Sequence, residues 1–103
     1  MFIARWQIEA RFGHKQAALE LMRKWEREIG PKVGLAEMEF TLLTGSVGAK
    51  EAVIEASHKL PTLAALDAMF ETLAGIPEHA AWGMELEPHV VSGSSRWQIF
   101  RLL

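Results

Sequence analysis

The chain begins with a regular alternation of apolar and polar residues. In residues 2–12, one set of alternate positions holds Phe, Ala, Trp, Ile, Ala and Phe, and the other is mostly charged or polar. A period of two with aromatic and branched side chains predicts a half-buried β-strand, which Gly13 ends. Similar alternation predicts strands in residues 35–43 and 51–58, and a last strand is predicted in residues 96–103.

Two segments between these strands change to the helical period. Residues 14–29 carry an apolar stripe, and Gly30-Pro31 stops the helix. A second helix is predicted after Thr62, which is a good N-cap residue, and it ends near residues 75–77. A short turn of helix is predicted at PEHAAWGM, residues 77–84. The stripe of the first helix consists of Ala18, Leu21, Met22, Trp25 and Ile29.

The resulting order, β-α-β-β-α-β, is that of the ferredoxin-like split βαβ arrangement. We therefore predict a single α+β domain over residues 1–103, with a four-stranded antiparallel sheet in the order 4-1-3-2 and both helices on one face. The segment TGSVGAK is predicted to be the turn of a hairpin between the second and third strands. The first and third strands are expected to be central, parallel neighbours.

The tetrapeptide RWQI occurs in the first strand and again in the last. In the predicted topology these two strands are antiparallel neighbours, so the repeat indicates cross-strand matching rather than a duplicated module. Two registers are open. Either Trp6 lies opposite Trp97, or a slip of two residues puts Glu9 opposite Arg96. Both registers direct the two tryptophans to the helix side of the sheet.

Composition removes several classes of function. The formal net charge is −2 and no basic run is present, which disfavours nucleic-acid binding. No apolar stretch approaches the roughly 20 residues that span a bilayer. The chain has no cysteine and no tyrosine, so thiolate and phenol chemistry are excluded. A cytoplasmic location is expected, because Arg5 interrupts the position where a signal peptide needs its apolar run.

The sheet face away from the helices is the part of the predicted fold with an open role. Apolar side chains are mixed there with charges: Ile3, Leu43, Val53, Phe100 and Leu102. A mixed surface of this kind suits the wall of an enclosed, partly polar chamber. A face that is simply solvated is the other interpretation.

The β-α-β-β-α-β order, the EIGPKVG exit from the first helix and the final VVSGSSRWQIFRLL resemble the dimeric α/β-barrel superfamily. Its members include antibiotic-biosynthesis-type monooxygenases, stress-responsive barrel proteins and NIPSNAP-like proteins. The resemblance implies a homodimer whose open sheet faces meet and enclose small-molecule sites. Haem-degrading members use a histidine with an Asn and a Trp, and cyclase-like members use a Tyr and a His. This chain has neither Asn nor Tyr, so neither activity is carried over.

Glu9, Glu55 and His58 are the predicted catalytic residues. If the first and third strands are parallel neighbours, their IEA segments bring Glu9 and Glu55 together, and repulsion raises the pKa of one carboxyl. An inert Arg–Glu network is the alternative. His58 is expected at the end of its strand, near the barrel mouth, as an acid/base or ligand contact. The predicted ligand-binding residues share the open face: Arg5, Gln7, Glu37, Glu39, Arg96, Gln98 and Phe100.

No metal site and no cofactor are predicted. Glu85, Glu87 and His89 alternate, but three ligands within five residues, interrupted by Pro88, suit tetrahedral coordination poorly. The predicted function is therefore a homodimeric barrel that binds a small organic molecule between its two sheets. Two forms remain open: a cofactor-independent monooxygenase, isomerase or lyase, and a non-catalytic ligand carrier or stress-associated barrel protein.

Overall fold

The computed structural model describes residues 1–35 and 40–103. Four strands form one antiparallel sheet: β1 (Phe2–Glu9), β2 (Phe40–Thr44), β3 (Val53–Leu60) and β4 (Arg96–Arg101). The strand order is β2-β3-β1-β4, which is the predicted order 4-1-3-2. The chain is therefore an α+β protein with the ferredoxin-like fold.

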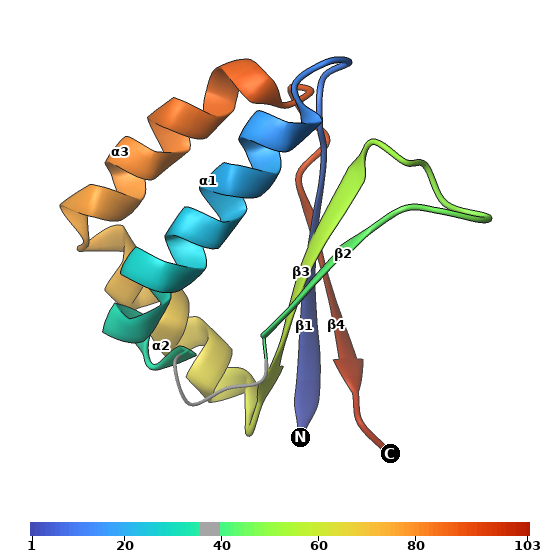
Figure 1. Ribbon diagram of the computed structural model, residues 1–103. Helices are drawn as coiled ribbons and strands as arrows, with labels where there is room; N and C mark the ends of the chain where they lie inside the picture. Colours follow the sequence, from blue (N-terminus) through green and yellow to red (C-terminus); the bar gives the residue numbers. More distant parts are fainter. Residues whose placement is uncertain (36–39) are drawn as a thin grey trace.

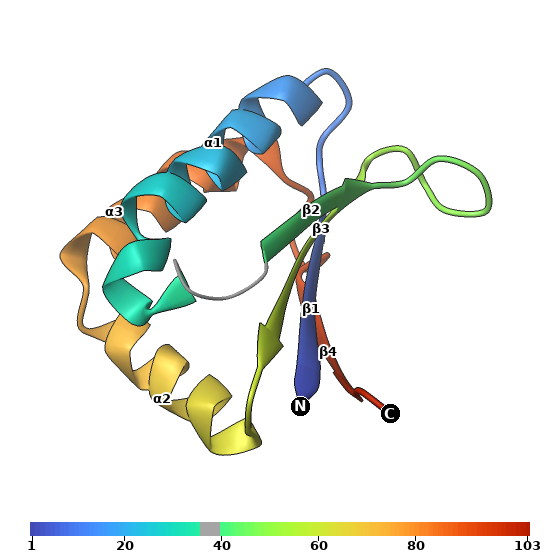
Figure 2. The same ribbon diagram turned by 60° about the horizontal axis from the view of Figure 1, so that its bottom comes forward.

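Helices cover one face of this sheet and leave the other face open (Figure 1). They are α1 (Lys15–Glu28), α2 (Leu63–Ala74) and α3 (Pro77–Leu86), with 3₁₀ turns η1 (Gly30–Val33) and η3 (Glu87–His89). Figure 2 shows α1 and α3 running side by side, with α2 near the other end of the sheet. Among the described residues, no helix combines the length and apolar composition that a membrane crossing needs.

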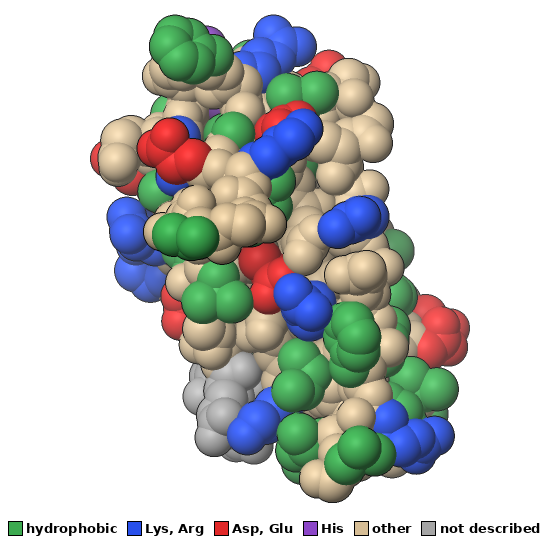
Figure 3. All heavy atoms as spheres, turned by 90° about the vertical axis from the view of Figure 1, so that its right-hand side faces the viewer, with side chains coloured by type: hydrophobic (Ala, Val, Ile, Leu, Met, Phe, Trp, Pro, Cys, Tyr) green, Lys and Arg blue, Asp and Glu red, His purple; other side chains and the backbone are tan. Residues whose placement is uncertain are grey.

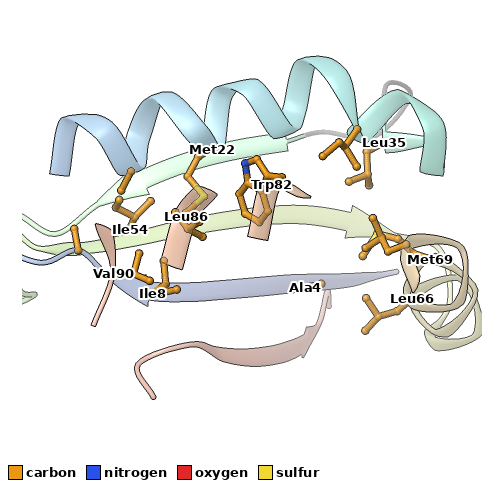
Figure 4. Close-up of a cluster of buried hydrophobic side chains, with 14 of the residues drawn as sticks. Ala4, Ile8, Met22, Leu35, Ile54, Leu66, Met69, Trp82, Leu86 and Val90 are labelled. Atoms are coloured by element: carbon orange, nitrogen blue, oxygen red, sulfur yellow. The ribbon is translucent and has the colours of Figure 1, made fainter. Parts of the chain in front are cut away.

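The core lies between the sheet and the helices, as the apolar stripes predict. Ala18, Met22 and Ile29 from the first stripe are buried. They meet Ile8 and Ile54, which point from the sheet (Figure 4). The N-cap prediction for α2 is confirmed, because the Thr62 hydroxyl accepts a hydrogen bond from Ala65 N at 3.1 Å.

Several element boundaries differ from the predictions. The first strand stops at Glu9, and Phe12 is fully exposed in a turn closed by a hydrogen bond from His14 N to Arg11 O. Gly13 in this turn has φ +83°, a conformation that favours glycine. The third strand runs two residues later than predicted, and the fourth ends at Arg101. The short turn expected at residues 77–84 is a ten-residue helix, α3, with Pro77 at its start.

The RWQI repeat confirms the first of the two predicted registers. Trp6 lies opposite Trp97 across β1 and β4. The expected parallel pairing of the first and third strands is wrong, because β1 and β3 are antiparallel. The crossover through α1 brings β2 back in the direction of β1, and the hairpin then reverses the chain, so β1 and β3 run in opposite directions. In this register Glu55 lies opposite Gln7 and Glu9 lies opposite Val53.

Candidate functional site

On the open face of the sheet, Glu55 is the centre of a hydrogen-bonded polar network. Its Oε1 accepts hydrogen bonds from Arg5 Nη2 at 2.7 Å, Arg5 Nε at 3.1 Å and Gln7 Nε2 at 2.6 Å. Arg96 Nε in turn donates to Gln7 Oε1 at 2.9 Å. Three adjacent strands therefore supply one connected network. This arrangement corresponds to the Arg–Glu network that the sequence offered as the alternative to a catalytic carboxylate pair.

The expected carboxylate pair of Glu9 and Glu55 is replaced by two separate ion pairs. Glu9 Oε1 lies 3.3 Å from Lys50 Nζ, and Glu55 is bonded to Arg5. Burial acts to raise the pKa of Glu55, but the hydrogen bonds from Arg5 and Gln7 and the charges of Arg5 and Arg96 outweigh it. The pKa of Glu55 is thus lowered, not raised as expected, and the carboxylate is ionised at neutral pH.

The other predicted residues of this face have different surroundings. The Arg5 guanidinium carbon lies 5.1 Å from the centre of the Phe100 ring, a cation–π distance, and Gln98 lies opposite Arg5 in the strand register. Figure 3 shows hydrophobic and charged side chains mixed across this face. Glu37 and Glu39 lie outside the described residues.

A cavity of about 410 Å³ lies on the opposite side of the sheet, between the strands and the helices. No charged side chain of the described residues lines it, and its wall is mainly aromatic. The lining consists of Trp6, Trp25, Trp82, Trp97, Phe40, Phe70, His58, His79, Met22, Ala56, Met69, Leu73 and Ala74. All four tryptophans of the chain contribute to this wall.

His58 is the buried polar residue of this cavity. It lies inside β3 on the helix side, opposite Ala4 and Phe40, and only 4% of its surface is exposed. The expectation that His58 ends its strand is therefore wrong, since β3 continues to Leu60. Its ring stacks on Phe40 with centres 5.7 Å apart. Within the described part of the chain, neither ring nitrogen has a hydrogen-bond partner.

Burial lowers the pKa of His58 to about 4. The cause is the cost of placing a charged imidazolium among apolar groups, with no carboxylate of the described cavity wall to offset it. At neutral pH the ring is therefore uncharged. A neutral imidazole offers one N–H donor and one nitrogen acceptor, so His58 can pair with a polar group of either kind.

His79 is a second imidazole in the cavity wall. Trp25 Nε1 donates a hydrogen bond to His79 Nδ1 at 3.0 Å, and the His79 ring stacks on Trp82 with centres 5.9 Å apart. Burial lowers its pKa as well. His79 was not among the predicted site residues, although its spacing to Trp82 places both on one face of a helix.

The tryptophans form a continuous wall from β4 to α1. Successive ring centres lie 6.4 Å apart for Trp97 and Trp6, 6.3 Å for Trp6 and Trp82, and 6.3 Å for Trp82 and Trp25. Trp82 is buried and its Nε1 donates to Leu21 O at 2.6 Å, which fixes α3 against α1. Three of these indoles were expected only as core residues, and here they also shape a cavity.

A separate pair of histidines lies outside the cavity lining. Nδ1 of His14, at the start of α1, lies 2.9 Å from Nδ1 of His89 in η3. The described residues contain no cluster of three or more side chains that could hold a metal ion. The pair joins the β1–α1 turn to the end of α3.

Comparison with known proteins finds similarity in structure but no match in sequence. No protein-family model matches the chain, and no curated protein matches it. A NIPSNAP family protein from Agrobacterium tumefaciens superposes with a TM-score of 0.81, covering 99% of this chain and 92% of that chain at 17% identity. The fold is that of the NIPSNAP proteins and the antibiotic-biosynthesis-monooxygenase-like proteins.

Two further solved structures agree. A NIPSNAP domain protein from Burkholderia xenovorans has a TM-score of 0.74 and 12% identity, covering 100% of this chain and 95% of that chain. An antibiotic biosynthesis monooxygenase has a TM-score of 0.68 and 12% identity, covering 100% and 99%. The resemblance noted from the sequence is thus confirmed for the fold.

Proposed function

We propose that this protein binds an uncharged, largely aromatic small molecule in the cavity between its sheet and its helices. The observation that carries the proposal is His58, a buried imidazole with no partner in the described residues, in an apolar cavity of about 410 Å³. An unpaired buried polar group costs about 1–3 kcal/mol, and a ligand that pairs with it recovers that cost.

The cavity wall supports the chemical class of the ligand. Small-molecule sites of about 300–1,000 Å³ are typically apolar, with a few polar groups that fix orientation. Here the polar groups are two neutral imidazoles, and the described lining has no charged side chain. An ionised ligand group would lose its hydration in such a wall without gaining a counter-charge, so the buried part of the ligand is uncharged.

Binding through the open sheet face was the prediction from the sequence, and the proposal moves the ligand to the other face. Glu55, Gln7 and Arg96 already satisfy one another on the open face. A ligand there would have to break bonds that exist. The ring nitrogens of His58 have no such bonds to break within the described residues.

A cofactor-independent enzyme is the second candidate, with His58 as the group that accepts a proton from the ligand. It is favoured by the neutral state of His58 and by the monooxygenase names of some structural neighbours. A pKa of about 4 makes the empty-cavity imidazole a weak base, because an efficient general base has a pKa near the working pH. Ligand binding is therefore the first candidate function and catalysis the second.

We also propose that two copies of the chain associate through their open sheet faces. Leu43 and Phe100 are half exposed there among satisfied charges, and burying them against a second copy would remove apolar surface from water. A dimer by sedimentation at micromolar concentration, lost in the Phe100→Asp variant, would support this. A monomeric wild type would reject it.

The binding proposal is tested by calorimetric titration with 2-naphthol, a neutral bicyclic phenol. We expect binding to the wild type and about tenfold weaker binding to His58→Phe, because the phenyl ring cannot pair with the hydroxyl group. His14→Phe, which changes a histidine outside the cavity lining, is the matched control and should bind as the wild type does. Equal affinity in all three proteins would exclude His58 as the ligand contact.

A further inference from the structure

The hydrogen bond between Trp25 and His79 fixes which nitrogen of His79 carries its proton. An indole N–H can only donate, so His79 Nδ1 must be the acceptor at 3.0 Å and carries no hydrogen. In the neutral ring the hydrogen is therefore on Nε2. Because burial lowers the pKa of His79, the neutral ring is the form present at neutral pH.

The ring is also held in place from two sides. It stacks on Trp82 with centres 5.9 Å apart and a 16° angle between planes, and Trp25 meets its edge at 73°. Trp82 is itself fixed by its hydrogen bond to Leu21 O. His79 is half-buried and lines the cavity, and its hydrogen bond with Trp25 uses Nδ1 rather than Nε2.

From this we infer that Trp25 and His79 together present a fixed hydrogen-bond donor to the cavity, and that the ligand carries a neutral acceptor oxygen to meet it. Trp25 is the positioning residue and His79 is the binding residue. This inference rests on the proposed ligand site. It deepens that proposal by naming a polar group of the ligand, a carbonyl or ether oxygen.

The two imidazoles differ in what they can accept. His58 has no partner on either nitrogen in the described chain, so it can take either tautomer and suit a donor or an acceptor. His79 cannot adapt without giving up the bond from Trp25. A ligand that places an N–H or ammonium group against His79 would leave two donors facing each other, which disfavours its binding.

The test compares two probes of nearly equal shape, 2-acetonaphthone and 2-isopropylnaphthalene. They differ in that the first has a carbonyl oxygen where the second has a methyl group. We expect the wild type to bind 2-acetonaphthone about tenfold more tightly, and this ratio to fall to about one in His79→Phe. The His14→Phe control should keep the wild-type ratio.

The outcomes separate this inference from the proposed function. If neither probe binds the wild type, the proposed function fails, and the inference fails with it. If both bind equally, or if the tenfold ratio survives in His79→Phe, the cavity is a ligand site but the donor inference is overturned.

A spectroscopic measurement tests the positioning role of Trp25. In the wild type, ¹⁵N spectra should show Nδ1 of His79 without hydrogen and Nε2 with hydrogen. In Trp25→Phe the donor to Nδ1 is gone, so the pKa of His79 should rise and the 2-acetonaphthone preference should fall. An unchanged pKa and an unchanged preference in this variant would show that Trp25 does not set the state of His79.

Discussion

The buried polar groups on the two faces of the sheet have opposite surroundings. On the open face, the Glu55 carboxylate accepts three hydrogen bonds and has a lowered pKa. On the helix face, His58 is equally buried, has no partner in the described chain, and has a pKa lowered to about 4. The pKa of each group falls, but for Glu55 this reflects stabilisation of the charged form, and for His58 destabilisation of it.

This contrast shows where a ligand has something to gain. In a hydrogen-bonded network such as that of Glu55, the residues already stabilise one another, so a structural role accounts for them without any ligand. An unsatisfied imidazole in a cavity lowers stability until something binds. In the sequence, the charged residues indicated the open face as the ligand site. In the structure, the unpaired side chain of His58 indicates the helix face instead.

The largest expected effect is a loss of folding stability at acidic pH. The His58 pKa is about 4 when folded against an ordinary value of 6.5, so the unfolded chain takes up the proton first as pH falls. Stability should therefore drop between about pH 6.5 and pH 4, by about 3 kcal/mol, since each pKa unit is worth about 1.4 kcal/mol.

The two faces should lose stability in different pH windows. The lowered pKa of Glu55 gives a contribution that is lost only as pH falls below the ordinary value of 4.5. Urea unfolding from pH 4 to pH 7 should show the His58 component, and His58→Phe should lack it. The same slope in both proteins would contradict the account.

The next effect is on the open face. Arg5→Met removes two of the three hydrogen bonds to a buried carboxylate and should destabilise the fold by about 2 kcal/mol. The cost is below that of a fully buried pair because the Arg5 side chain is 36% exposed. Urea unfolding measures the loss, and 2-naphthol affinity should not change. A lower affinity would return the ligand to the open face.

A matched ion pair away from both faces is the control. Lys24 and Glu85 are 3.2 Å apart on the surface, and Lys24→Met should cost less than 1 kcal/mol. A cost equal to that of Arg5→Met would mean that burial of Glu55 contributes nothing.

A smaller effect of opposite sign is expected from His58→Phe. This variant removes two unpaired nitrogens and adds apolar volume beside a cavity, so it should be more stable by about 1 kcal/mol at pH 7. Thermal unfolding without ligand measures the gain. A clear loss of stability would indicate that His58 makes a stabilising contact, and it would weaken the functional interpretation.

The smallest effect is expected from Phe12→Ser, outside both faces. Phe12 is fully exposed, so its replacement should change the free energy of unfolding by less than about 0.5 kcal/mol. Urea unfolding checks this, and a loss above 1 kcal/mol would mean that Phe12 belongs to the core after all.

The sequence predicted the fold well because the fold depends on periodicity. Alternation predicted the first three strands, the helical stripes predicted α1 and α2, and the observed register of β1 and β4 is one of the two that the RWQI repeat left open. Phe12 was misassigned because alternation continues through the turn at Gly13, where the backbone leaves the sheet. The parallel pairing was an error of topology, and it created the expected carboxylate pair.

The site was harder to predict because it depends on which buried polar groups have hydrogen-bond partners in the folded structure. The periodicity of the sequence does not determine this. Alternation does place His58 with Ile54 and Ala56 on the apolar face, so the signal of a polar residue on a buried face was present. Whether a cavity remained there depended on how α2 and α3 pack, which periodicity does not determine. His79 lies within the helix predicted at residues 77–84, but periodicity did not show that this helix lines a cavity.

The most direct test of the helix-face site is a titration of ¹⁵N-labelled protein with 2-naphthol, followed by ¹H–¹⁵N correlation spectra. All four indole N–H groups of the chain belong to tryptophans that line the cavity, so each reports on its occupancy. The account predicts saturable shifts of the indole signals while the backbone amide of Glu55 and the side-chain amide of Gln7 stay still. Shifts at Gln7 and Glu55 with unmoved indole signals would contradict it.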